Sequence, residues 1–172
     1  LESEHGERRS WVWAKLEQTP LANALGHLAT LAKETEHSVG GDTPDSMAEI
    51  YARSGFLADD AVLKALGTLK AVEDIQAVTV AVRALYLSWL DDSARRFQET
   101  MTSHELPDAA KIKESSVSYD HRECILFCDG LRFDLAHRLV AFSEERHLRA
   151  QLKHTWAALP TVTGTAKPAV SP

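Results

Sequence analysis

The sequence predicts a mainly α-helical chain, in which a helical bundle-like module over residues 1–106 precedes the first strand, helix and strand of an α/β domain over 121–172. Apolar residues recur at helical spacing through the module, and one such pattern runs from about 73 to 101 without Gly or Pro. The composition then changes to a continuous apolar run over 124–128. Residues 107–120 are polar and are predicted to form a connector.

Composition and charge restrict the class of protein. The chain has 172 residues, of which 44% are hydrophobic and 26% charged, which excludes global disorder. Charged residues interrupt every apolar stretch before it reaches membrane-spanning length, so no membrane association is expected. The net charge is −6, and residues 1–106 carry 10 basic and 17 acidic side chains. Such an acidic surface disfavours non-specific binding of nucleic acid by this module.

The first helices are placed by their start signals and apolar spacing. Ser10 is predicted to cap a short helix that carries Trp11. Thr19 and Pro20 form a typical helix start, with a capping residue followed by proline at the first helical position. The apolar face of this second helix is formed by Leu21, Leu25, Leu28 and Leu31. The polar, glycine-containing run over 38–42 ends it.

Three further helices complete the module. Thr43 repeats the start signal before Pro44, and Gly55 is predicted to end that helix. Asp59 or Asp60 is predicted to open the next helix, which Gly67 ends. The long helix follows over about 73–101, with its apolar face at Ile75, Val78, Val82, Tyr86, Trp89, Phe97 and Met101.

The apolar run over 124–128 is typical of a strand that is buried on both faces in a parallel sheet. A helix over about 131–143 and a second strand within 148–158 should complete a right-handed crossover. In a strand, the Cα atoms of Cys124 and Cys128 would lie about 13 Å apart, which excludes a disulfide between them. Both cysteines are therefore interpreted as small buried hydrophobes of a cytoplasmic protein.

Two segments carry residues suited to chemistry. Asp129 and Gly130 directly follow the predicted strand, where ligands of parallel α/β sheets bind. The Asp129 carboxylate could ligate a divalent cation or simply cap the next helix. Further on, Thr161, Thr163 and Thr165 alternate between Pro and Gly. A threonine there could act as a nucleophile, or these threonines could cap a helix and bond their own backbone.

Together the two segments resemble the alkaline phosphatase superfamily and, within it, the PglZ family of the bacterial BREX phage-defence systems. The resemblance is carried by the sequences ILFCDGLRFD at 125–134 and WAALPTVTGTAKP at 156–168, and by their order and spacing. The helical stretch LYLSWL at 85–90 also resembles the region before the catalytic core of that family.

The resemblance implies a phosphohydrolase, most simply a phosphodiesterase, that acts on a phosphate ester or nucleic-acid substrate. Asp129 would bind one ion of a two-metal site, usually zinc. Thr163 would be the nucleophile on the same metal, which lowers its hydroxyl pKa, and it is preferred to Thr161. Lys167 and Arg132 are candidate phosphate-binding residues, although Lys167 could equally be an exposed surface residue and Arg132 could instead pair with Asp134 and fix the turn.

One departure from the superfamily is large. Its remaining Asp and His ligands lie well downstream of the nucleophile, whereas this sequence has nine residues after Thr163. His137, His147 and His154 are interpreted as surface or core residues rather than as replacements. The chain is therefore expected to be an inactive fragment of the enzyme, and its truncated sheet could self-associate. The alternative is a non-catalytic scaffold whose helical module docks to other defence-system proteins.

Overall fold

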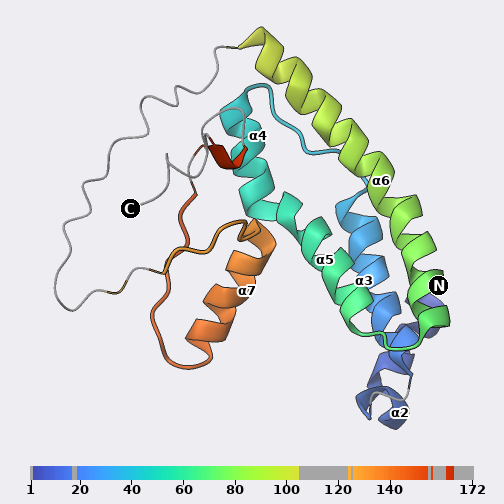
Figure 1. Cartoon of the computed structure of the whole chain (residues 1–172). Helices are drawn as coiled ribbons and strands as arrows, with labels where there is room; N and C mark the ends of the chain where they lie inside the picture. Colours follow the sequence, from blue (N-terminus) through green and yellow to red (C-terminus); the bar gives the residue numbers. More distant parts are fainter. Residues whose placement is uncertain are drawn as a thin grey trace. The chain divides into compact units, whose positions relative to one another are not determined.

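The computed structural model describes residues 2–16, 19–104, 124, 126–154, 156 and 162–164. The chain divides into two compact units, residues 1–104 and 105–172. Their elements are coloured along the sequence in Figure 1. The first unit contains α1 (Glu2–His5), the 3₁₀ helix η1 (Gly6–Ser10), α2 (Val12–Lys15), α3 (Pro20–Glu34), α4 (Pro44–Ile50), the π-helix η2 (Tyr51–Gly55), α5 (Phe56–Gly67) and α6 (Val72–Ser103), and the second unit contains α7 (Phe133–Glu144). The prediction of a mainly α-helical chain is therefore confirmed for the described residues.

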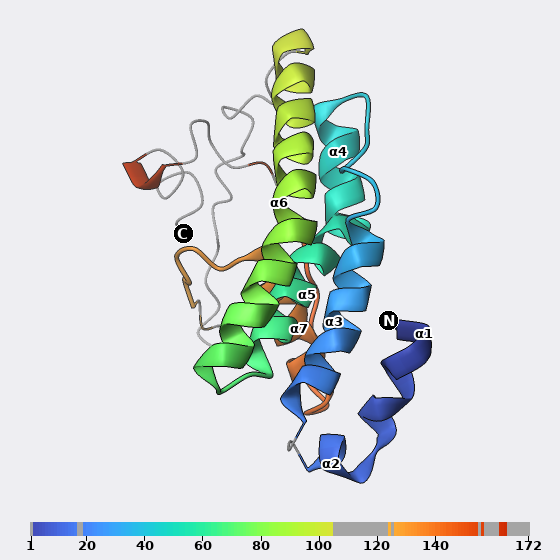
Figure 2. The ribbon, with the colours of Figure 1, turned by 90° about the vertical axis from the view of Figure 1, so that its right-hand side faces the viewer.

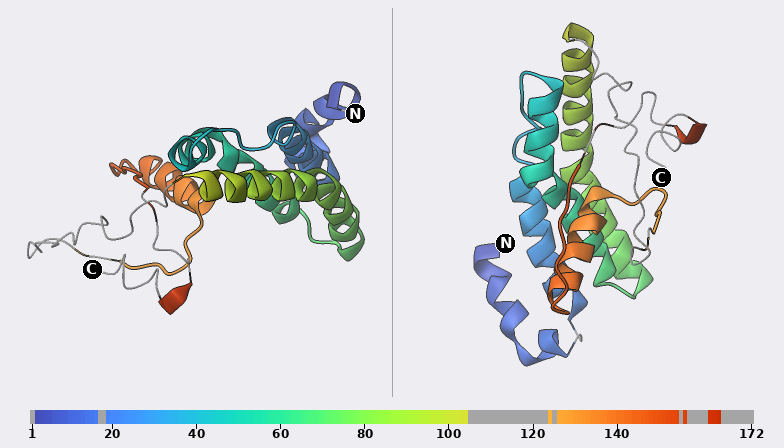
Figure 3. Two further views of the ribbon diagram at one scale, coloured as in Figure 1. Left: turned by 90° about the horizontal axis from the view of Figure 1, so that it is seen from above. Right: turned by 90° about the vertical axis from the view of Figure 1, so that its left-hand side faces the viewer.

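The predicted long helix is confirmed as α6, which has 32 residues and is about 48 Å long. It runs beside α3, α4 and α5 of the first unit (Figure 3). Val78, Val82 and Trp89 on one of its faces are buried. Glu73 and Asp74 lie in its first turn, where the helix dipole favours negative charge.

The helix that starts at Thr19 and Pro20 is also confirmed. Thr19 is the N-cap residue of α3 and Pro20 is its first helical residue. Leu31 is fully buried on the inner face of α3 and belongs to the core of the first unit. In this unit α3 packs against both α5 and α6 (Figure 2), and these three helices supply most of the core residues.

Gly55 does not end a helix, and this prediction was wrong. The chain continues from α4 through the π-helix η2 directly into α5. Gly55 has ordinary right-handed helical angles, and a Cβ there would lie 2.9 Å from Cδ2 of Tyr51. The glycine thus allows the Tyr51 ring to pack closely against the backbone, instead of providing a left-handed helix end.

Because the helix continues, Asp59 and Asp60 do not open α5, contrary to the prediction. Both lie inside α5 and both are buried. Asp60 forms an i,i+4 ion pair with Lys64, with Oδ2 and Nζ 2.6 Å apart. The end of this helix at Gly67 was predicted correctly.

Ser10 does not cap α2, which also corrects the prediction. Trp11 is the N-cap residue of α2, and Ser10 ends the preceding 3₁₀ helix η1. The Ser10 hydroxyl donates a hydrogen bond to the Glu7 carbonyl at 2.6 Å, so it bonds backward along the chain. A serine hydroxyl that accepts no bond from the next turn leaves that helix start uncapped.

The loop between α3 and α4 is fastened to α6 by two hydrogen bonds. Trp89 Nε1 donates to the His37 carbonyl at 3.0 Å, and the Val39 amide donates to Ser93 Oγ at 3.0 Å. Thr43 then caps α4 in a capping box with Ser46, in which each side chain accepts from the other residue's amide. The predicted start at Thr43 is confirmed.

Gly41 is the glycine on which this loop depends. Its φ is +122°, and a Cβ would lie 2.7 Å from the Met47 backbone nitrogen. We expect Gly41→Ala to reduce the free energy of unfolding of the first unit by about 2 kcal/mol, because both the backbone angle and the space require glycine. Urea unfolding followed by circular dichroism measures this. Gly40→Ala is the matched control, because nothing lies within 4 Å of a Cβ there. Equal effects of the two substitutions would contradict the prediction.

In the second unit, the predicted helix over 131–143 is confirmed as α7. α7 ends in a Schellman motif, in which the Leu148 amide donates to the Ser143 carbonyl and the His147 amide donates to the Glu144 carbonyl. His147 adopts a φ of 61°, the left-handed conformation that this cap requires. The hydrogen bonds that form the turn after α7 therefore join residues within 143–148.

The predicted strands are not formed by the described residues of this unit. Cys124 and residues 126–128 are exposed and have no regular structure, and Leu126 is 84% exposed. Residues 148–154 and 156, within the second predicted strand, are also irregular. A strand is stabilised by pairing with a neighbour in a sheet, and the described residues provide no partner strand.

No helix among the described residues is both long enough and apolar enough to span a membrane.

Candidate functional site

The turn that precedes α7 presents the first predicted site residue. Asp129 and Gly130 form this turn, and Gly130 has a φ of +71°. Glycine adopts this left-handed conformation without the strain that a side chain would cause. The Asp129 side chain is exposed, so its carboxylate can be reached from solvent.

An arginine–aspartate pair lies at the start of α7. Arg132 is the N-cap residue, and its Nε and Nη2 donate to Oδ1 and Oδ2 of Asp134 at 3.0 and 3.3 Å. This two-bond geometry is the strongest form of arginine–carboxylate pairing. Asp134 is only 1% exposed, whereas the Arg132 side chain is about half exposed. The predicted pairing of Arg132 with Asp134 is confirmed.

Two of the histidines meet the same aromatic ring. Phe133 contacts His137 edge to face, with ring centroids 4.8 Å apart, and it contacts His154 in the same manner at 6.0 Å. His137 follows Phe133 by four residues, so the first contact could have been found from helical spacing. The contact with His154 is tertiary and has no local signal. These contacts fit the interpretation of His137 and His154 as surface or core residues.

The second predicted segment is described only over 162–164. Thr163 and Gly164 have helical backbone conformation, and the Thr163 side chain is exposed. Thr161 and Lys167 lie outside the described residues. Of the three candidate residues Thr161, Thr163 and Lys167, the structure therefore describes the surroundings of Thr163 alone.

Metal ligands do not gather within the described part of the chain. No group of three or more His, Cys, Asp or Glu side chains there could hold a metal ion. Cys124 and Cys128 are both exposed, which corrects the expectation that they are buried. The strand geometry that excluded a disulfide between them is also not adopted by the described residues of that segment.

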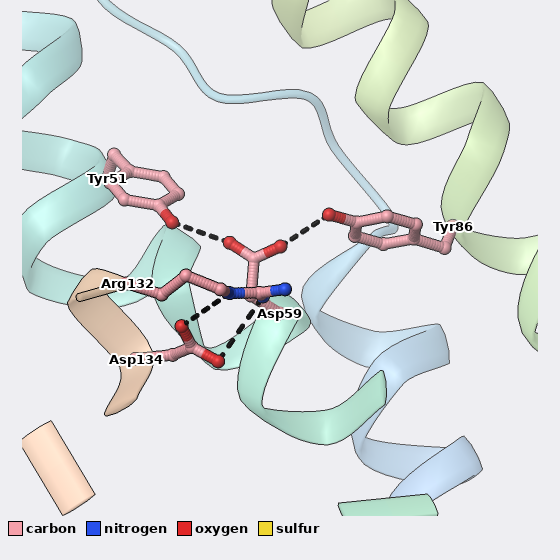
Figure 4. Close-up of polar contacts among 5 residues, drawn as sticks. All are labelled: Tyr51, Asp59, Tyr86, Arg132 and Asp134. Carbon is pink, nitrogen blue, oxygen red and sulfur yellow. Dashed lines mark hydrogen bonds and ion pairs between the residues drawn. The ribbon is translucent and has the colours of Figure 1, made fainter. Parts of the chain in front are cut away.

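A polar centre in the first unit was missed by sequence reasoning. The Asp59 carboxylate accepts a hydrogen bond from each of two tyrosines, from Tyr51 Oη to Oδ2 at 2.5 Å and from Tyr86 Oη to Oδ1. The two rings reach the carboxylate from η2 and from α6, as Figure 4 shows. Asp59 itself is 8% exposed. Such a buried carboxylate, with a donor on each oxygen, links three elements of the fold.

Comparison with protein-family models, with curated proteins and with solved structures gave no match for this chain.

Proposed function

We propose that this chain is part of a metal-dependent phosphohydrolase of the PglZ type, in the alkaline phosphatase superfamily. Its substrate would be a phosphodiester, and it would act in the cytoplasm with the other proteins of a bacterial BREX phage-defence system. The observation that carries the proposal is the exposed Asp129 carboxylate in the glycine turn that opens α7. A metal ligand has to be held in place by the backbone around it, and this turn does so for Asp129.

The residues after Asp129 support this assignment by fixing the turn. Gly130 supplies the left-handed conformation, and the pair of Arg132 with buried Asp134 anchors the first turn of α7. In the proposal Arg132 is mainly a positioning residue, because two of its donors are already used by Asp134. Arg132 and Lys167 remain the residues proposed to contact the substrate phosphate.

Thr163 is proposed as the nucleophile. Its exposed side chain supports this role, because a hydroxyl that attacks phosphorus must be reached by the substrate. The helical backbone at Thr163 and Gly164 would direct free amide groups toward a bound phosphate if a helix starts there. The Thr163 hydroxyl would lose its proton as its oxygen bonds to phosphorus, the phosphorus–ester oxygen bond would break, and the leaving oxygen would take up a proton. Water would then attack the phosphorus of the phosphothreonine intermediate and release the Thr163 hydroxyl.

A metal site needs more ligands than these residues supply. Zinc in proteins takes about four ligands, and the described residues bring no three candidate side chains together. The exposed carboxylate of Asp129 fits the role of a single oxygen ligand but cannot form the site alone. We propose that two zinc ions would be held with Asp and His residues that follow the nucleophile in longer members of the superfamily.

The same reasoning applies to the predicted sheet. We propose that residues 124–128 become a buried strand when neighbouring strands pair with them, and that α7 then forms the crossover to the second strand. The apolar and now exposed side chains of Leu126 and Phe127 support this proposal, because they would be covered in a complete sheet. Without such partners, we expect these side chains to favour self-association.

A scaffold is the second candidate function. It is favoured by two large exposed aromatic side chains, Trp11 and Trp13, which are 52% and 58% exposed in the first unit. Tryptophan is enriched among the residues that dominate protein–protein binding energies. In this alternative, the helical unit docks to other defence-system proteins and no hydrolysis occurs.

The role of Asp129 is tested with a protein that contains this chain and the downstream ligands. We expect Asp129→Ala to reduce metal-dependent hydrolysis of a phosphodiester by at least about a hundredfold at a fixed zinc concentration, because losing a ligand weakens metal binding. Hydrolysis is measured against zinc concentration, so that lost affinity appears as a shift of the curve. Glu144→Ala is the matched control, because Glu144 is an exposed carboxylate at the end of α7. Unchanged zinc dependence in Asp129→Ala would overturn the assignment.

A further inference from the structure

We propose that α6 carries a second apolar face, through which the chain binds a second copy of itself in antiparallel orientation. On this face Val80, Leu87 and Leu90 are 69%, 49% and 43% exposed. Val80 and the buried Trp89 are nine residues apart, which is two and a half helical turns, so they lie on opposite sides of the helix. The face is therefore separate from the one that packs in the core.

The spacing along α6 makes this face complementary to itself. In a two-fold antiparallel pair with its axis beside Leu87, this leucine meets its own copy. Residues at equal distances from position 87 then face each other across the pair. Val80 would meet Ala94, and Ala84 would meet Leu90, so on either side of the central Leu87 pair a large side chain faces a small one. This alternation allows two helices to approach closely.

Charge complementarity indicates that the partner bound to this face is a second copy of the chain, and that the two α6 helices are antiparallel. Arg83 and Asp91 are each four residues from Leu87, and both are exposed. The antiparallel pair therefore places Arg83 of each copy opposite Asp91 of the other. A parallel pair in register would instead place Arg83 against Arg83. Asp91 also accepts from Arg95 on its own helix, with Oδ2 2.6 Å from Nη2, and this exposed contact leaves its other oxygen for the second copy.

The test is the mass of the full chain in solution, measured by sedimentation over a range of concentrations. We expect a reversible dimer, and we expect Arg83→Glu and Asp91→Arg each to weaken it by about tenfold or more, because each change creates two like-charge contacts. The double substitution restores the opposite charges, so it should dimerise within about threefold of the original chain. Circular dichroism of each variant checks that α6 remains folded.

Arg96→Glu is the matched control. It changes the net charge by the same amount as Arg83→Glu, and it lies on α6 roughly 140° around the helix from Arg83. We expect it to dimerise like the original chain. A chain that is monomeric at all concentrations would overturn the proposal. A dimer that Arg83→Glu does not weaken, or that the double substitution does not restore, would also overturn it, because its contact would lie elsewhere.

Discussion

Thr163→Ala is expected to reduce phosphodiester hydrolysis by at least about a thousandfold in a protein that contains this chain and the downstream metal ligands. Alanine keeps the backbone but removes the hydroxyl oxygen that is proposed to form the covalent bond to phosphorus. A thousandfold loss corresponds to about 4 kcal/mol of transition-state stabilisation. The loss should appear in kcat, and substrate binding should change little, because the hydroxyl acts mainly in the transition state.

Two matched variants make this result specific. Thr163→Ser keeps the hydroxyl and should retain activity within about tenfold. Thr161→Ala removes a neighbouring hydroxyl of the same motif and should have a much smaller effect. If Thr161→Ala abolished hydrolysis while Thr163→Ala did not, the nucleophile would be Thr161 instead.

Thr163→Ala also distinguishes the proposed enzymatic function from the alternative scaffold function. A defence system that depends on hydrolysis should lose protection against phage with Thr163→Ala, whereas a scaffold should keep it. Full protection by this variant, at unchanged protein level, would contradict the enzymatic proposal and favour the docking role of the helical unit.

Asp59→Ala is expected to reduce the free energy of unfolding of the first unit by about 3 kcal/mol. The substitution removes the acceptor of two tyrosine hydroxyls, and hydrogen bonds to charged groups contribute about 1.5–3 kcal/mol each. It also leaves both hydroxyls in a partly buried setting without this acceptor. Urea unfolding of the full chain, followed by circular dichroism, measures the change.

Further variants assign the loss to the two hydrogen bonds. Tyr51→Phe and Tyr86→Phe should each cost about 1–2 kcal/mol, and their effects should not add, because both act on the same carboxylate. Asp59→Asn keeps one acceptor and should cost less than alanine. Arg95→Ala removes an exposed i,i+4 ion pair and should cost under about 1 kcal/mol. If Asp59→Ala also reduced the free energy of unfolding by under about 1 kcal/mol, a structural role for the buried carboxylate would be contradicted.

Most helices were predictable because their signals are local. α6 has a long apolar pattern without a breaking residue, and α3 and α4 each begin with a threonine at the N-cap position followed by proline. The arginine–aspartate pair before α7 was foreseen for a similar reason, since Arg132 and Asp134 are two residues apart. Such features depend on backbone geometry within one or two turns.

The errors occurred where packing overrides a local signal. Glycine commonly ends a helix, but Gly55 lies inside a continuous helix, where it leaves room for the Tyr51 ring to pack against the backbone. That continuation turns Asp59 from a predicted helix start into a buried acceptor. Its two tyrosine partners lie 8 and 27 residues away, so no pattern along the chain could place them together.

The sequence by itself determined where α3 and α4 begin and that α6 is one long helix, since helix formation depends on spacing and caps that neighbouring residues carry. It also identified Asp129 and Thr163 as candidates, because motifs are visible as residue order. Only the tertiary structure decided which polar groups are buried, which face of α6 stays exposed and whether an apolar run forms a strand. These outcomes depend on partners far along the chain, and burial and strand pairing are stabilised only when those partners meet.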